Sequence, residues 1–219
     1  MSTVNKFPTI MYHQPDQYRF SHDSVFLARN VFEMLTSHNK LPTTVLDLCA
    51  GCGIIGLDFL HHLLAEQQNI PIRIDFIEVQ EIYSPYFQMN VETLKAKFPR
   101  SNQTVINFLN INYESFSDNM QKYDLILCNP PYFETSQGSL SPSEFKNRCR
   151  FFIDGTFKGL LKFITKSLNT NGEAYVLLRD QSAHGIDILK QTENFLGSSF
   201  VLQKMDDIRG THLIKIIHV

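Results

Sequence analysis

Apolar residues recur along this chain in two patterns. Short apolar runs, typical of strands buried on both faces of a sheet, alternate with longer segments in which apolar residues return every three or four positions, as on one side of a helix. The short runs predict strands over residues 45–50, 72–79, 104–109, 123–128, 173–179, 200–205 and 212–219. The longer segments predict helices over residues 21–38, 54–67, 85–98, 145–168 and 183–196. This alternation predicts an α/β fold with helices on both faces of the sheet.

The last two predicted strands follow one another without a helix. They are separated by the polar stretch of residues 206–211, which contains Gly210, and this arrangement predicts an antiparallel β-hairpin. The expected architecture is therefore a Rossmann-like, mostly parallel sheet of about seven strands that ends in a hairpin, which differs from the all-parallel dinucleotide fold.

The composition suits one domain. Of 219 residues, 43% are apolar and 19% charged, as in a globular protein. We expect residues 1–40 to form an N-terminal arm and a lid helix within the same domain as residues 41–219. No apolar run approaches the roughly 18 residues of a membrane helix, and the start lacks the apolar segment of a secretory signal, so the expected location is the cytoplasm. The expected state is a monomer.

The four cysteines and two adjacent histidines were considered as metal ligands. Cys49 and Cys52 have the spacing of a redox or zinc pair, but Cys52 lies between two glycines, and no second Cys or His pair has zinc spacing. We expect reduced cysteines and no metal. His61 and His62 are expected at the surface of their helix.

A glycine-rich turn follows the first predicted strand. Gly51, Gly53 and Gly56 have the spacing that lets a backbone turn tightly and approach a nucleotide cofactor. Asp47 lies at the end of that strand, where its carboxylate would repel a diphosphate and attract the ammonium and sulfonium groups of S-adenosylmethionine. This reasoning favours a methyl donor over NAD. Glu78, at the end of the next strand, can accept hydrogen bonds from both ribose hydroxyls.

The fourth predicted strand ends in the sequence Asn129-Pro130-Pro131-Tyr132-Phe133. An amino group conjugated to a purine or an amide is a poor nucleophile, because its lone pair is delocalised. Hydrogen bonds from that group to the Asn129 side chain and the Pro130 carbonyl would favour a tetrahedral, attacking geometry, and the two prolines would hold these acceptors in place. Tyr132 and Phe133 offer faces on which a flipped-out base can stack.

Three segments carry a resemblance to known proteins. The sequence Val-Leu-Asp-x-x-Ala-Gly-x-Gly over residues 45–53 resembles the first motif of class I methyltransferases, and residues 129–132 resemble the catalytic motif of their amino-methylating members. The sequence Tyr-Arg-Phe-Ser-x-Asp-Ser-Val-Phe-Leu-Ala over residues 18–28 resembles the N-terminal signature of the bacterial valine-tRNA adenine-N6 methyltransferases. The resemblance implies the class I methyltransferase fold, S-adenosylmethionine as cofactor and tRNA as substrate.

The same resemblance assigns roles to individual residues. It implies that Ser24 meets the cofactor carboxylate, that Ala50 and Asn129 contact the cofactor, and that Asn110 and Ile111 hold its adenine. At the position of Asn110 the family usually carries Asp, and an amide oxygen can still accept from the adenine amino group.

The polyanionic substrate must be bound locally, because the formal net charge is -2. A basic stretch follows the catalytic motif, and Lys146, Arg148 and Arg150 are candidates for phosphate contacts; a solvated helix face explains the same pattern. Here the sequence Asn-Arg-Cys-Arg over residues 147–150 replaces the Ala-Arg-His-Glu of tRNA-modifying relatives, which leaves the substrate open.

Three functions are compatible with these residues. The leading one is N-methylation of a nucleic-acid exocyclic amine, adenine N6 in tRNA above all. The alternative is N5-methylation of a protein glutamine, which is also a planar amide. A non-catalytic cofactor-binding or RNA-binding module is the third.

Overall fold

The computed structural model describes residues 10–115 and 121–219, so the start of the predicted N-terminal arm lies outside the described residues. Seven strands form one sheet in the order β3-β2-β1-β4-β5-β7-β6. The strands are β1 Thr44–Leu48, β2 Arg73–Ile77, β3 Val105–Leu109, β4 Tyr123–Cys128, β5 Leu168–Leu178, β6 Phe200–Lys204 and β7 His212–His218. The first five run parallel, and β7 pairs antiparallel with both β5 and β6. The predicted architecture, including the terminal hairpin, is confirmed.

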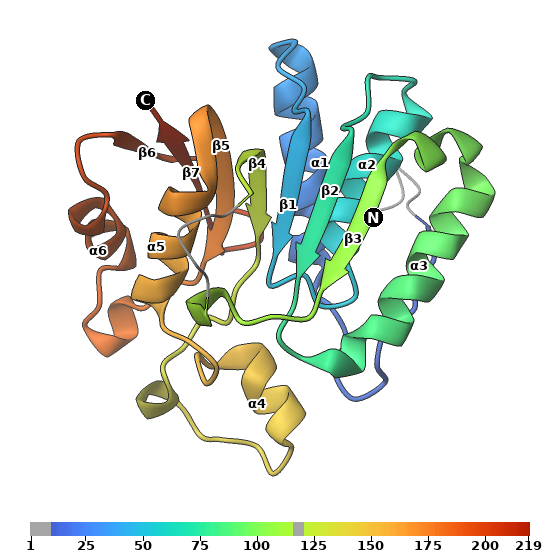
Figure 1. The fold of residues 1–219 in the computed structure, drawn as a ribbon. Helices are drawn as coiled ribbons and strands as arrows, with labels where there is room; N and C mark the ends of the chain where they lie inside the picture. Colours follow the sequence, from blue (N-terminus) through green and yellow to red (C-terminus); the bar gives the residue numbers. More distant parts are fainter. Residues whose placement is uncertain (1–9, 116–120) are drawn as a thin grey trace.

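Helices cover both faces of this sheet (Figure 1). The helices are α1 His22–Ser37, α2 Ile54–Ala65, α3 Ser84–Lys97, α4 Glu144–Arg150, α5 Phe157–Ser167 and α6 Ile188–Phe195. Within the parts of the chain that the structure describes, no helix has the length and apolarity needed to cross a membrane.

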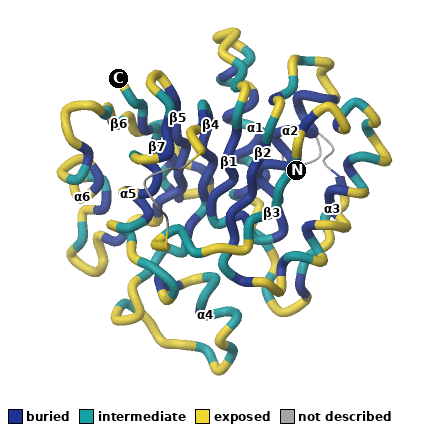
Figure 2. Tube along the Cα trace, viewed as in Figure 1, coloured by how far each residue is buried: buried dark blue, intermediate teal, exposed yellow. Residues whose placement is uncertain are grey.

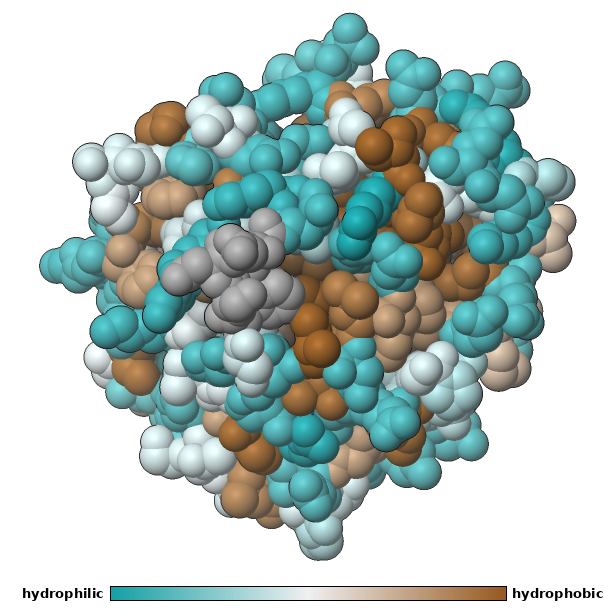
Figure 3. All heavy atoms as spheres, in the orientation of Figure 1, coloured by the Kyte–Doolittle hydropathy of each residue, from teal (hydrophilic) through white to brown (hydrophobic). Residues whose placement is uncertain are grey.

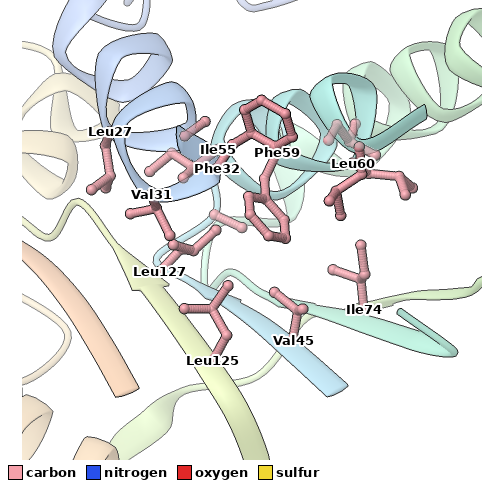
Figure 4. Packing of buried hydrophobic residues seen from close by; sticks show 14 of the residues in the cluster. Leu27, Val31, Phe32, Val45, Ile55, Phe59, Leu60, Ile74, Leu125 and Leu127 are labelled. Atoms are coloured by element: carbon pink, nitrogen blue, oxygen red, sulfur yellow. The ribbon is translucent and has the colours of Figure 1, made fainter. Parts of the chain in front are cut away.

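Side chains of successive strand residues point into two different hydrophobic clusters. Leu125 and Leu127 join the cluster that contains residues of α1, α2 and α3, whereas Ile126 and Cys128 join the cluster of α5 and α6. Strands buried on both faces appear as the dark centre of the molecule in Figure 2, and Figure 4 shows the first cluster, with Val31 and Phe59 above Leu125. Burial on both faces explains why the strands are continuous apolar runs and not alternating ones.

The edge strand β3 is less covered than the central strands. Val105 is 56% exposed, and Ile72, just before β2, is 60% exposed. Hydrophobic atoms gather beside β3 on a face that is otherwise mostly hydrophilic (Figure 3).

One predicted helix, over residues 145–168, is wrong. The structure divides it into α4 and α5, because the intervening chain pairs with the loop after β4: Phe151 forms a parallel bridge with Phe133, and the Phe152 amide donates to the Phe133 carbonyl at 2.8 Å. The Thr156 hydroxyl then caps α5 by accepting from the Gly159 amide at 2.9 Å. Helical spacing continues across this break in the sequence, and only the pairing with Phe133 interrupts it.

The expected surface position of His61 and His62 is also wrong. Both are buried, at 3% and 4% exposure. His62 stacks on Phe32 of α1 with ring centroids 5.3 Å apart, and His61 meets Phe98 edge-on at 5.2 Å. Helix α2 is buried along nearly its whole length, so even its polar positions have neighbours.

Candidate active site

The carboxyl ends of the central strands open into a cavity of about 390 Å³. Segments far apart in the sequence line it: residues 14–24, 49–55, 77–83, 111–113, 129–133 and 148–155, together with Arg179. In Figure 1 helix α4 lies beyond the ends of these strands, on the side toward which β1 and β4 point. Parallel strands thus deliver the glycine turn, Glu78 and residues 129–133 to one edge of the sheet, where residues of the 14–24 segment meet them.

The three glycines of the first turn have different tasks. Gly51 lines the cavity and has a positive φ of 54°. Gly53, with φ 82°, packs against α3, where an added Cβ would lie 2.6 Å from the Phe87 ring. Gly56 meets Phe76 of β2 at the same distance. Of the three, Gly51 is therefore the one placed to touch a ligand, while Gly53 allows close packing against α3 and Gly56 lets α2 approach the sheet closely.

The electrostatic argument for Asp47 needs correction. Its carboxyl is fully buried, does not line the cavity, and accepts from the Gly56 amide at 2.8 Å through Oδ2. Oδ1 has no hydrogen-bond partner among the described residues. Burial raises the pKa of Asp47 well above its usual value, and the charge of Glu78 adds to this rise. Asp47 fixes the start of α2, and burial weakens the case for it as a charged contact of the cofactor.

Glu78 faces the cavity and is held by two backbone amides. Oε2 accepts from Gly51 and Oε1 from Gln80, each at 2.8 Å. Burial raises the pKa of Glu78, and these two hydrogen bonds oppose the rise. The residue predicted for ribose is thereby joined to the glycine turn. Asn110 does not line the cavity; its amide donates to the Glu78 carbonyl at 2.8 Å, while the neighbouring Ile111 does line it.

Asn129 joins the predicted lid helix to the catalytic motif. Its Nδ2 donates to the Ser24 hydroxyl at 3.0 Å, and its Oδ1 accepts from the Tyr132 hydroxyl at 2.6 Å. Ser24, Pro130 and Pro131 line the same cavity. Residues separated by more than a hundred positions, which the sequence assigned to one site by resemblance alone, are therefore in direct contact.

The loop after β4 is held by the start of the α4–α5 connection. The amides of Tyr132 and Phe133 both donate to the Arg150 carbonyl at 3.1 Å. Gln181 donates to the Tyr132 carbonyl, which anchors the loop from the other side. The two aromatic rings lie edge to face, with centroids 6.3 Å apart, and both line the cavity.

The structure separates the three predicted basic contacts. Lys146 does not line the cavity. Arg148 lines it but forms a two-pronged ion pair with Asp154, at 2.8 and 2.7 Å, which raises the pKa of Arg148. Arg150 also lines the cavity and lies over the Phe151 ring at 5.5 Å, with no carboxylate partner among the described residues.

Several residues that line the cavity were not predicted from the sequence. Arg179, at the end of β5, lines the cavity and donates to the Thr211 hydroxyl at 3.0 Å. The Tyr83 hydroxyl lies 3.2 Å from the Cys149 sulfur. The same sulfur lies 3.5 Å from the side-chain amide nitrogen of Gln80. The position of Arg179 just past a strand was the one available signal, because strand ends converge on this edge. Tyr83 and Cys149 belong to segments that only the tertiary fold brings together.

Over residues 10–115 and 121–219, no group of three or more His, Cys, Asp or Glu side chains is arranged to hold a metal ion. All four cysteines are free.

A family model described as lysine methyltransferase matches residues 21–137, more than half of the chain. The chain belongs to this methyltransferase family. The match includes Ser24, the glycine turn, Glu78 and the Asn129 loop, and it ends before Arg148 and Arg150. The matched residues therefore include most of the segments that line the cavity and exclude residues 148–155 and Arg179.

Two curated relatives are named tRNA1(Val) (adenine(37)-N6)-methyltransferase. The one from Shewanella woodyi is 28% identical over 143 residues, 63% of this chain and 53% of the relative. The one from Shewanella sp. W3-18-1 is 31% identical over 146 residues, 66% of this chain and 56% of the relative. The chain spans about half the length of these methyltransferases.

Solved structures support the fold. A 16S rRNA N2 G1207 methyltransferase of T. thermophilus, in complex with AdoMet and guanosine, superposes with a TM-score of 0.62 at 14% identity, over 93% of this chain and 45% of that one. A methyltransferase from Pyrococcus furiosus gives 0.57 at 16% identity, over 94% and 87%. Both share the architecture of this methyltransferase domain.

Proposed function

We propose that this chain transfers a methyl group from S-adenosylmethionine to the N6 amino group of an adenine in tRNA. The proposal rests on the position of Asn129, which lines the same cavity as Gly51 and Glu78. The names of the curated relatives support tRNA as the substrate.

The lining residues fit S-adenosylmethionine by the chemistry of their donors and acceptors. Glu78 keeps lone pairs for ribose hydroxyls after accepting from two amides, and Ile111 offers an apolar surface to adenine. Ser24 offers a hydroxyl to the amino-acid end, and the open backbone of Gly51 allows close approach. The bound cofactor supplies a methyl group on a positively charged sulfur. Asn110 would orient the segment around Glu78, because its side-chain amide donates to the Glu78 backbone carbonyl.

The amine needs an acceptor and not a strong base. A neutral, planar NH2 group that donates to Asn129 Oδ1 is drawn toward a tetrahedral nitrogen, whose lone pair becomes available to accept the methyl group that the cofactor would supply. Pro130 and Pro131 keep the acceptors aimed, since their backbone torsions are restricted. Tyr132 and Phe133 hold the base by stacking.

This arrangement favours a conjugated amine over lysine, the residue in the family description. A lysine with a pKa of about 10.4 must lose a proton before it can attack. The acids that line the cavity are engaged: Asp154 by Arg148, Glu78 by two amides, and Asp23 by Arg209 at 3.6 Å. A glutamine amide meets the same requirement as adenine, so protein N5-methylation stays the alternative.

The three basic residues differ in how well they are placed to contact the substrate. Arg150 is the best placed for phosphate, because it lines the cavity and has no carboxylate partner within residues 10–115 and 121–219. Arg148 would have to leave Asp154, and Lys146 could reach only nucleotides outside the cavity. We also propose that the chain acts as a monomer in the cytoplasm, without a metal, and that residues 1–40 belong to the catalytic domain.

The test is methyl transfer from labelled S-adenosylmethionine to three substrates: unmodified tRNA, a protein extract and a lysine-rich histone. Label in tRNA that digests to N6-methyladenosine supports the proposal. Label in protein only, as methylglutamine or methyllysine, would replace it. Cofactor binding without transfer to any of the three would favour the non-catalytic module.

A further inference from the structure

The acceptor oxygen proposed for the substrate amine already has a donor. Asn129 Oδ1 accepts from the Tyr132 hydroxyl at 2.6 Å, while Nδ2 is directed to Ser24 at 3.0 Å. We propose that the Tyr132 hydroxyl occupies the subsite of the transferred amino nitrogen and must leave it before methylation. This inference rests on the proposed function and identifies where in the cavity the nucleophile sits.

The geometry supports such a substitution. A hydroxyl and an amino group are similar in size, and each can offer one hydrogen to a carbonyl oxygen at about 2.6–3.0 Å. Tyr132 and Asn129 both line the cavity, and the hydroxyl of the first donates to the amide oxygen of the second there. The Asn129 oxygen has two lone pairs and the phenol hydroxyl takes one of them, so a base that donates to the same oxygen from the cavity competes with Tyr132 for that position. The hydroxyl therefore has to move away before the base binds there.

The backbone around Tyr132 restricts this movement to the side chain. Its amide donates to the Arg150 carbonyl at 3.1 Å, and its carbonyl accepts from Gln181. Pro131 precedes it, and the pyrrolidine ring fixes the φ angle of Pro131. Rotation about the side-chain bonds moves the hydroxyl from Asn129 and leaves the ring in the cavity for stacking.

The expected cost of displacement is one hydrogen bond between neutral groups. Such a bond changes an equilibrium by roughly two- to tenfold. The unliganded cavity is thus occupied by its own side chain, and the specificity constant for the substrate is reduced by that factor. Burial raises the pKa of Tyr132, so the phenol stays protonated and keeps its role as donor across the neutral range.

The decisive variant is Tyr132→Phe, which keeps the ring and removes only the hydroxyl. With tRNA as substrate, kcat/KM should rise by roughly two- to tenfold, mainly through a lower KM, because Asn129 no longer has a competing donor. Tyr86→Phe is the matched control, since Tyr86 lies outside the cavity and its hydroxyl has no hydrogen-bond partner in the described part of the chain. Thermal unfolding of both variants checks that the fold is kept.

The contrary results separate the two proposals. An unchanged or lower kcat/KM in Tyr132→Phe, with the unmodified chain active on tRNA, overturns the amine-subsite assignment alone. A lower kcat with unchanged KM would mean that the hydroxyl helps catalysis as a positioning group. If the unmodified chain transfers no methyl to RNA, the proposed function itself fails.

Discussion

The two ends of the cavity are built differently. At the end formed by Gly51 and Glu78, polar side chains are held by backbone amides within the β1–α2 and β2–α3 connections. At the end formed by Asn129 and Tyr132, side chains hold one another: Asn129 donates to Ser24 of the distant helix α1 and accepts from Tyr132 in its own loop. Backbone amides keep their positions as long as the sheet and its connections are folded. Contacts between side chains can be exchanged for a ligand, so the first end suits an invariant cofactor and the second suits a substrate.

The largest effect should come from Asn129→Ala. This change removes the acceptor of the amine and the link to Ser24, so kcat should fall by roughly 100- to 1,000-fold. Calorimetry should find S-adenosylmethionine affinity within a few fold of the unmodified chain, because the glycine turn is untouched. A loss of cofactor affinity as large as the loss of kcat would show that the two ends are not independent.

The glycine turn offers the next test, a comparison of Gly53→Val with Gly51→Ala. At Gly53 a side chain would meet Phe87 at 2.6 Å and also has to adopt φ 82°, so unfolding free energy should fall by roughly 2–4 kcal/mol.

At Gly51 the nearest atoms to a new Cβ are 3.6 Å away, which leaves the positive φ as the main cost, about 1–2 kcal/mol. Urea unfolding measures the stability of both variants. For the same loss of unfolding free energy, titration with S-adenosylmethionine should show a larger loss of cofactor affinity in Gly51→Ala than in Gly53→Val. Equal unfolding free energies for Gly51→Ala and Gly53→Val would mean that α3 shifts at Phe87 to make room for the new side chain.

A smaller effect is expected from Arg150→Gln. If this guanidinium contacts one phosphate, tRNA affinity should fall by roughly three- to tenfold, and the slope of log affinity against log salt should become shallower by about one. Lys146→Gln is the control, because its side chain does not line the cavity. The same loss in both variants would assign the effect to general surface charge.

The smallest effect concerns pH. Asp47 has a raised pKa in the folded state, so folding binds its proton more tightly, and stability falls as pH rises from about 4 through that raised value. Asp47→Asn cannot lose this stability, so the variant should gain relative to the unmodified chain as pH rises. Asp180→Asn should behave oppositely, since bonds from Ser182 lower the pKa of Asp180. Parallel pH trends in urea unfolding would contradict the burial argument.

Much of the fold follows from the sequence alone, because strands buried on both faces are continuous apolar runs and helices keep a three- to four-residue period. The predicted strand over residues 123–128 coincides with β4, and the turn around Gly51, the Glu78 position and residues 129–133 all reach the cavity. These motifs lie at the ends of parallel strands, and parallel strands end at one edge. Local sequence is enough to place them there.

Tertiary structure decided what local pattern does not encode. Periodicity predicted one continuous helix, but the pairing of Phe151 with Phe133 divides it in two. His61 and His62 were expected at the surface, but neighbouring segments bury them. The same is true of charge: Asp47 and Arg148 have the right residue types, but one is buried against Gly56 and the other is neutralised by Asp154. The partners of a side chain come from distant segments, and only the folded chain brings those segments into contact.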